Sequence, residues 1–167
     1  SRLIDIMIGR WPLLMNDVEY DFTPSTSSLV SDNIKYITFR DSYGDSDTNL
    51  YYQQRWNSQD LEITPLVRDL LPVIHDSHLT EQLYSLFGVE EMLDKHIVLL
   101  SSGEMRKFQI VKTLLANPRI LIMDNPFIGL DADTRTLLKN LFSQLINQFS
   151  LQLVLVVSKP NDIPDFI

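Results

Sequence analysis

The chain has 167 residues with 14 Lys and Arg against 22 Asp and Glu, so its formal net charge of −8 disfavours direct binding to nucleic acid. It has no cysteine, which excludes disulfides and thiolate metal sites, and its three histidines are too scattered for an imidazole metal cluster. An apolar fraction of 44% fits one globular domain. Without a signal-peptide pattern or an apolar run of roughly 20 residues, we expect a cytoplasmic protein, with the inner face of a membrane as an alternative location.

Taken in chain order, the first half combines apolar segments with polar loops. Helical apolar spacing in residues 3–8 predicts a helix that Gly9 ends. Apolar and β-branched residues predict short strands within 13–22 and 34–40, and the Ser/Thr/Pro-rich stretch 23–33 between them predicts a loop.

The middle of the chain begins with the acidic, polar residues 41–49, which are typical of a solvated insertion between elements. Apolar positions from Thr64 to Phe87 fit helices that break near Pro72 and around 75–78.

The second half predicts regular alternation of helices and strands. Residues 101–116 and 137–149 have helical apolar spacing, whereas 120–123 and 151–157 are short, nearly continuous apolar runs. Buried strands joined by helices are typical of an α/β fold with a mostly parallel sheet and crossover helices.

The strand at 120–123 is followed by a carboxylate, Asp124. Ligands of open α/β sheets gather at the carboxyl ends of strands, and a carboxylate there can hold Mg²⁺ beside the phosphates of a nucleotide. The alternative is that Asp124 only caps the turn that follows.

A second polar group opens the helix at 101–116, with the sequence Leu100-Ser101-Ser102-Gly103-Glu104. Hydroxyls and a glycine at a helix N-terminus present N–H donors and the positive end of the helix dipole, which favour an anion. The alternative is an ordinary serine N-cap with a nearby glutamate.

In this order and spacing, residues 100–104, 120–124 and Gly129-Leu130-Asp131 resemble the ATP-binding domain of ABC ATPases, over about Leu100 to Lys159. They look like the signature motif, the Walker B strand and the D-loop of that family. The resemblance implies a P-loop NTPase-like α/β core with a helical signature subdomain. It places the core remainder and Q-loop region at 1–60, the helical subdomain at 61–99, and the signature helix, Walker B strand, D-loop and last core strand at 100–167.

The resemblance also implies an ATP and Mg²⁺ site. Asp124 would hold the metal with Ser1, which looks like the hydroxyl residue that ends a Walker A loop, and with the Q-loop glutamine. We take that glutamine to be Gln54, with Gln53 as the alternative, and expect the chain to be N-terminally truncated within Walker A. The nucleotide contacts of the signature and the D-loop would come from a larger set: Ser101, Ser102, Gly103, Glu104 and Asp131.

Two positions depart from the family pattern. Asn125 stands where active members have a glutamate, and an amide cannot accept the proton of the attacking water at neutral pH. Lys159 stands where the family has its switch histidine. The departures predict that the domain's own site, including Asp124, binds ATP and hydrolyses it slowly or not at all.

The family pairs two domains head-to-tail around ATP, which implies a second nucleotide-binding domain as partner, in the same full-length chain or in a dimer. Residues 52–57 and 157–166 are similar to the first half of tandem ATP-binding proteins of the ModF and photorepair PhrA type. A membrane transporter subunit is a further implied partner. Neither molybdate transport nor photorepair follows from any residue. Two alternatives stay open: a non-catalytic, ATP-dependent interaction module, and a nucleic-acid-associated ATPase.

Overall fold

The protein is described here by a computed structural model that covers residues 2–11, 18–23, 25–39, 64–73, 77–149 and 151–166. Its centre is a parallel sheet of three strands, ordered β1 (Ile34–Thr38), β2 (Ile120–Asp124) and β3 (Gln152–Val156). The register pairs Thr38 with Asp124 and Asp124 with Val156, so all three strands end at one edge. This α/β sheet confirms the predicted fold class.

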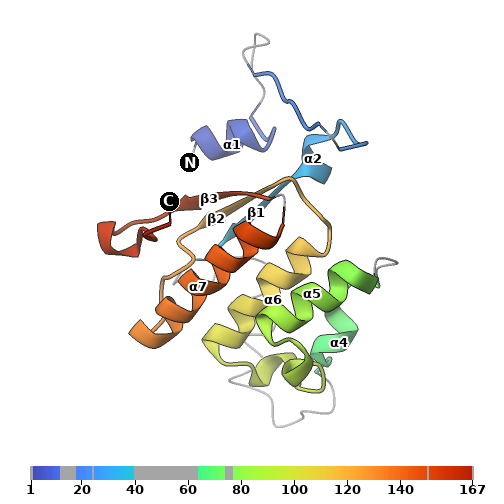
Figure 1. Cartoon of the computed structure of the whole chain (residues 1–167), viewed down its shortest axis with the longest axis vertical. Coiled ribbons are helices and arrows are strands. Elements are labelled where there is room, and N and C mark those ends of the chain that lie inside the picture. The colour runs from blue at the N-terminus through green and yellow to red at the C-terminus, as the bar shows by residue number, and fades with distance from the viewer. Residues whose placement is uncertain are drawn as a thin grey trace.

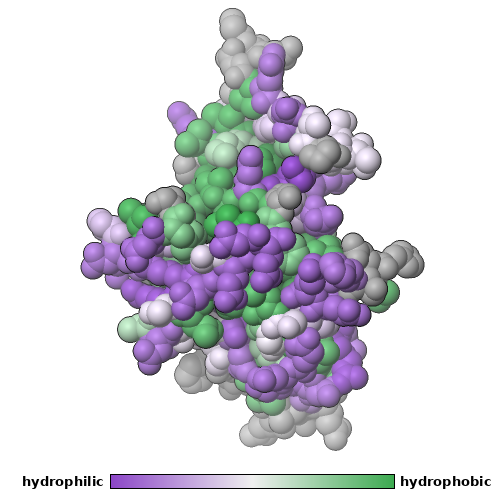
Figure 2. Space-filling view, viewed as in Figure 1, coloured by the Kyte–Doolittle hydropathy of each residue, from purple (hydrophilic) through white to green (hydrophobic). Residues whose placement is uncertain are grey.

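Two long helices cover one side of the sheet. In Figure 1, α6 (Ser102–Leu114) and α7 (Ala132–Gln148) lie below the strands, and α1 (Arg2–Met7) lies above them. The middle of β2 is completely buried, and its Leu121 and Met123 share one core cluster with apolar side chains of α6 and α7. The residues with no exposed surface include Leu121, Ile122, Met123, Ile110, Val111, Phe142 and Leu145. The side of α7 that faces the viewer is mainly hydrophilic, and apolar surface lies between it and α1 (Figure 2). The sheet is therefore held by the buried faces of two amphipathic helices.

Residues 64–73 and 77–100 form short helices beside α6. They comprise α4 (Val67–Leu70), α5 (Ser77–Phe87) and the single 3₁₀ turns η2 (Glu90–Met92) and η3 (Ile97–Leu99). Apolar side chains such as Val67, Leu83 and Phe87 are at most 1% exposed and belong to the same core cluster as Leu121 and Met123 of β2. This packing places the segment against the helix that carries the signature residues.

The N-terminal region differs from the sequence-based expectation. Residues 18–22, the described part of the strand expected at 13–22, form no strand. Instead the hydroxyl of Tyr20 donates to the carbonyl of Ile6 at 3.0 Å, and the Tyr20 ring stacks on Phe22 at 5.4 Å between centroids. The aromatic side chains that suggested a strand are thus used to attach this segment to α1. The helix end predicted at Gly9 is confirmed, because Gly9 has a φ of 70° directly after α1.

Two further element boundaries differ from those that the sequence predicted. The loop expected at 23–33 ends in the short helix α2 (Val30–Asn33), where the buried Asn33 amide donates to the carbonyls of Ser27 and Leu29. Helix α7 begins at Ala132 rather than 137, because Asp131 caps its first turn. Within the described ranges, no helix has both the length and the apolar character that crossing a membrane requires.

Candidate functional site

The carboxylate of Asp124 lies at the end of β2 and accepts hydrogen bonds from two directions. The Tyr36 hydroxyl on β1 donates to Oδ2 at 3.1 Å, and Nδ2 of Asn125 donates to Oδ1 at 2.8 Å. Both donors are neutral, so each orients the carboxylate without cancelling its charge. Asp124 is half-buried and keeps acceptor capacity on both oxygens.

Asn125 is held by its backbone as well as by its side chain. Its φ is 55°, in the left-handed region, and its N–H donates to the carbonyl of Val156 on β3 at 2.7 Å. The Oδ1 of Asn125 accepts a hydrogen bond from the hydroxyl of Ser158, just beyond β3. Asparagine adopts a positive φ more readily than most residues with a Cβ atom, so residue type and backbone agree here.

The side chain of Arg106 on α6 bonds to the loop after Asn125. Its guanidinium donates to the carbonyls of Pro126 at 2.6 Å and Ile128 at 2.8 Å, and lies 4.5 Å from the centroid of the Phe39 ring. These charge-assisted hydrogen bonds and the cation–π contact fix the loop relative to the helix that begins at the signature residues.

The predicted signature residues form a capped helix start. Ser101 is the N-cap of α6: its side chain accepts from the N–H of Glu104 at 3.2 Å, and its own N–H donates to Glu104 Oε2 at 2.8 Å. Lys95 Nζ donates to the other carboxylate oxygen, Oε1, at 2.6 Å. Burial raises the pKa of Glu104, but the hydrogen bonds from Lys95 and Ser101 and the charge of Lys95 together hold that pKa below its usual range. Ser101 and Ser102 are exposed.

The signature turn also contacts the start of α7. A Cβ atom at Gly103 would lie 3.0 Å from Cγ2 of Thr134, so a larger residue would press on α7. Thr134 in turn donates its N–H and its hydroxyl to the carboxylate of Asp131, at 2.9 and 2.8 Å. These two hydrogen bonds lower the pKa of Asp131. The predicted signature and D-loop residues are thus brought to one place.

The other predicted site residues are distributed as follows. Asp124 and Asn125 lie together at the sheet edge, and the exposed Lys159 follows Ser158 beyond β3. Ser1, Gln53 and Gln54 lie outside the described residues. Tyr36, Ser158 and Arg106, all bonded to this site, were not predicted. The strand order could have suggested Tyr36 and Ser158, because Tyr36 lies on β1 and Ser158 just beyond β3, the two strands that flank β2.

The polar groups at this edge suit a magnesium ion that is held mainly by a nucleotide. Mg²⁺ in such sites binds one or two carboxylates plus phosphates and water, and Asp124 supplies one carboxylate. Thr38, the register partner of Asp124, has a buried hydroxyl without a hydrogen-bond partner among the described residues. The described residues contain no cluster of three or more metal-ligating side chains, as a protein-only metal cage would need. The residues therefore fit nucleotide-bound Mg²⁺.

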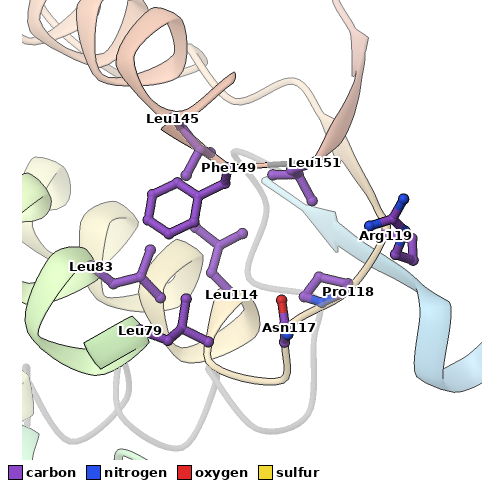
Figure 3. Close-up of a pocket in the computed structure, with 9 residues that line it drawn as sticks. All are labelled: Leu79, Leu83, Leu114, Asn117, Pro118, Arg119, Leu145, Phe149 and Leu151. Carbon is purple, nitrogen blue, oxygen red and sulfur yellow. The ribbon is translucent and has the colours of Figure 1, made fainter. Parts of the chain in front are cut away.

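A separate cavity of about 80 Å³ lies at the opposite edge of the sheet, beside the start of β2. Figure 3 shows Leu83, Leu114 and Phe149 gathered around it, with Arg119 to one side. Its lining is mainly apolar, which does not suit a polyphosphate, so the strand-end groups remain the candidate nucleotide site.

Comparison with known proteins identifies the family of the chain. The family described as "ABC transporter" matches residues 3–128. The ABC transporter ATP-binding protein ModF of Escherichia coli (strain K12) is 36% identical over 94 residues, which are 56% of this chain and 19% of ModF. An uncharacterised ABC transporter ATP-binding protein of Schizosaccharomyces pombe is 27% identical over 90% of this chain and 34% of its own length. The chain thus spans a minor part of these relatives.

Solved structures share the fold at low identity. A protein assigned as a metal-chelate type ABC transporter, in an inward-facing conformation, superposes with a TM-score of 0.61 and 16% identity, over 96% of this chain and 59% of that chain. CbiO1 from Clostridium perfringens, part of the ABC transporter complex cbiONQ, gives a TM-score of 0.56 and 16% identity over 78% of this chain and 49% of its own. These structures show the same fold, and the family match over residues 3–128 establishes that the chain belongs to the ABC transporter family, as an ATP-binding domain.

Proposed function

We propose that this domain is one half of an ATP sandwich whose two sites differ: its own site holds ATP with little hydrolysis, and its signature residues complete the active site of a partner nucleotide-binding domain. That partner is a second domain of the full-length protein or of a dimer. The relatives that this chain matches carry names from transport, which supports a membrane transporter subunit as a further partner.

The observation that carries this proposal is the hydrogen bonding of Asn125. A general base must accept a proton from the attacking water, and a carboxamide has no basic lone pair for that step at neutral pH. The Nδ2 of Asn125 donates to Asp124, and its Oδ1 accepts from Ser158. The amide is therefore engaged in holding neighbouring side chains, which leaves it little freedom to orient water.

Lys159 supports the same conclusion from the end of β3. It occupies the position of the family's switch histidine and is exposed beyond Ser158. An ammonium group can neutralise phosphate charge, but it is a donor only and cannot also accept a proton as a neutral imidazole can.

The signature side of the domain has the features that the partner's site needs. The capping box of Ser101 and Glu104 fixes the first turn of α6, and the exposed Ser102 follows directly. A helix start of this kind offers backbone N–H groups and a positive dipole end to phosphate. Ser102 and Gly103 would contact the ATP that is held mainly by the partner, and Asp131 would approach from the D-loop.

On the domain's own side, Asp124 would hold Mg²⁺, together with Ser1 and Gln54 as the family pattern implies. When bound, the ion offsets negative charge on the phosphates. Tyr36 and Asn125 orient the Asp124 carboxylate, and no residue described at this edge supplies the missing base.

The proposal is tested in the full-length protein by comparing Ser102→Glu with Asn125→Glu. The first places a negative charge where the partner's ATP would bind, and we expect steady-state turnover to fall about 100-fold, as for the loss of a major transition-state contact. The second adds a carboxylate at a left-handed backbone position and removes the bond to Asp124, so we expect turnover within about threefold of wild type.

Gln144→Glu is the matched control, because it adds one negative charge at an exposed position of α7 away from the strand-end edge. It should leave turnover unchanged. Single-turnover hydrolysis, resolved for each site, separates the proposal from an ATP-dependent interaction module, in which both sites would be slow. A larger effect of Asn125→Glu than of Ser102→Glu would contradict the proposal.

A further inference from the structure

A continuous chain of side-chain hydrogen bonds crosses the carboxyl-terminal edge of the sheet. Ser158 beyond β3 bonds to Asn125, Asn125 bonds to Asp124 at 2.8 Å, and Tyr36 on β1 bonds to the other side of Asp124 at 3.1 Å. The four side chains therefore connect the middle of β1, the end of β2 and the segment just beyond β3.

The direction of each bond in this chain follows from the chemistry of the groups. Asp124 is an acceptor when ionised, so the group of Asn125 that faces it must be the NH₂. The carbonyl oxygen of Asn125 then faces Ser158, whose hydroxyl is the donor. Asp124 thereby selects the orientation of the amide, and the Ser158 hydroxyl holds the carbonyl oxygen that this orientation presents to it.

The carboxylate of Asp124 is consequently held at both oxygens. Rotation of the carboxylate about the Cβ–Cγ bond of Asp124 would break its hydrogen bond with Tyr36 or its hydrogen bond with Asn125. Each oxygen accepts one of these neutral donors and retains a lone pair. Mg²⁺ demands near-ideal octahedral geometry, so a carboxylate with a fixed orientation binds the ion or its water shell at a lower entropic cost.

We propose that Ser158 and Tyr36 are positioning residues for Asp124, with Ser158 acting through Asn125. The proposal rests on the proposed function, because it assigns Asp124 to nucleotide-bound metal. It also explains what the asparagine at position 125 does: it transmits the constraint from Ser158 to the carboxylate.

The test measures Mn²⁺ binding to the full-length protein, saturated with a non-hydrolysable ATP analogue, by electron paramagnetic resonance of the free ion. The part of the Mn²⁺ binding that Asp124→Asn abolishes is the signal of this site. Ser158→Ala and Tyr36→Phe should each lower the Mn²⁺ affinity of this site about tenfold, as expected when a residue that hydrogen-bonds to a metal ligand is lost. Ser158→Thr, which keeps the hydroxyl, should bind Mn²⁺ as wild type does.

Two further comparisons isolate the mechanism. In an Asn125→Ala background, Ser158→Ala should have no additional effect on Mn²⁺ affinity, whereas Tyr36→Phe should still weaken it. Tyr20→Phe is the matched control, since it removes the hydroxyl that bonds to Ile6 beside α1 and should not alter Mn²⁺ binding.

The outcomes separate the two proposals. If Asp124→Asn leaves Mn²⁺ binding unchanged, the assignment of metal to Asp124 fails and the positioning role fails with it. If Asp124→Asn abolishes a component that Ser158→Ala and Tyr36→Phe do not weaken, the positioning role alone is overturned. Thermal unfolding by circular dichroism identifies any variant whose loss of binding comes from loss of the fold.

Discussion

The strand-end site and the signature turn use their polar groups in opposite ways. At the end of β2, the side chains of Asp124, Asn125 and Ser158 bond to one another. At the start of α6, Ser101 and Glu104 bond to each other's backbone, and the neighbouring Ser102 is exposed. The first arrangement fixes side chains in place, whereas the second fixes a helix end and leaves its outer surface for another molecule.

The difference indicates which region can act on a partner. A capping box satisfies part of the hydrogen bonding within the first turn, and the turn still presents backbone donors and dipole charge outward. The asparagine at the strand end has its donor and its acceptor directed at neighbours within the chain. On this basis we expect the predicted signature turn to act on a partner, whereas the side chains of the strand-end site hold one another in a fixed geometry.

Arg106 links the two regions, and its replacement should give the largest effect. Arg106→Leu would leave the carbonyls of Pro126 and Ile128 without their charged donor, and would remove the contact with the Phe39 ring. We expect a loss of about 2–4 kcal/mol in the free energy of unfolding, measured by urea denaturation.

Two variants sharpen the Arg106 measurement. Arg106→Lys keeps the charge but cannot reproduce the forked geometry, so its loss should be smaller than that of Arg106→Leu but still clear. Lys112→Gln removes a charge at an exposed position of the same helix and should stay within about 0.5 kcal/mol of wild type. Equal stability of Arg106→Leu and Lys112→Gln would show that the two regions are not joined through this side chain.

Removal of the helix cap should give an intermediate effect. Ser101→Ala deletes the side-chain acceptor for the N–H of Glu104, and loss of such a cap costs about 1 kcal/mol in the free energy of unfolding. Ser102→Ala is the natural comparison, because the neighbouring serine is not the cap and its loss should cost less. Chemical denaturation of both variants checks the order, and a larger loss for Ser102→Ala would contradict the capping assignment.

The sequence predicted the parts of this site that are contiguous in the chain. The apolar run that ends in Asp124 predicted a buried strand, and Ser101 with Glu104 gave the spacing of a capping box. Both signals lie within one element, where side-chain direction follows from helical or strand periodicity.

The parts that were missed depend on contacts between distant segments. Tyr36 is 88 residues from Asp124, and Ser158 is 33 residues from Asn125. Only the strand order brings these pairs together, and the sequence does not state it. The strand predicted within 13–22, which residues 18–22 do not form, has a related explanation. The preference of Tyr20 and Phe22 for strands was outweighed by their mutual stacking and by the hydrogen bond from Tyr20 to Ile6 of α1.

The smallest expected effect concerns the charge of Glu104 at the signature turn. Burial, the largest single influence, raises the pKa of Glu104, but the hydrogen bonds from Lys95 and Ser101 and the charge of Lys95 together lower it below 4.5. A carboxyl group whose pKa is lower in the folded state stabilises the fold above its unfolded pKa, and this contribution is lost as the pH falls through the folded pKa.

The free energies of unfolding of wild type and Glu104→Gln should therefore differ by a constant amount above about pH 5.5 and converge as the pH falls below 4.5. The difference should not exceed about 1 kcal/mol, because Lys95 is partly exposed and solvent screens its charge. Lys95→Gln should reduce the pH-dependent part of this difference in the free energy of unfolding, because it removes the charged partner of Glu104 while the hydrogen bonds with Ser101 remain. A difference that grew at low pH would mean that burial outweighs these hydrogen bonds, and that the turn presents a protonated Glu104 rather than a carboxylate.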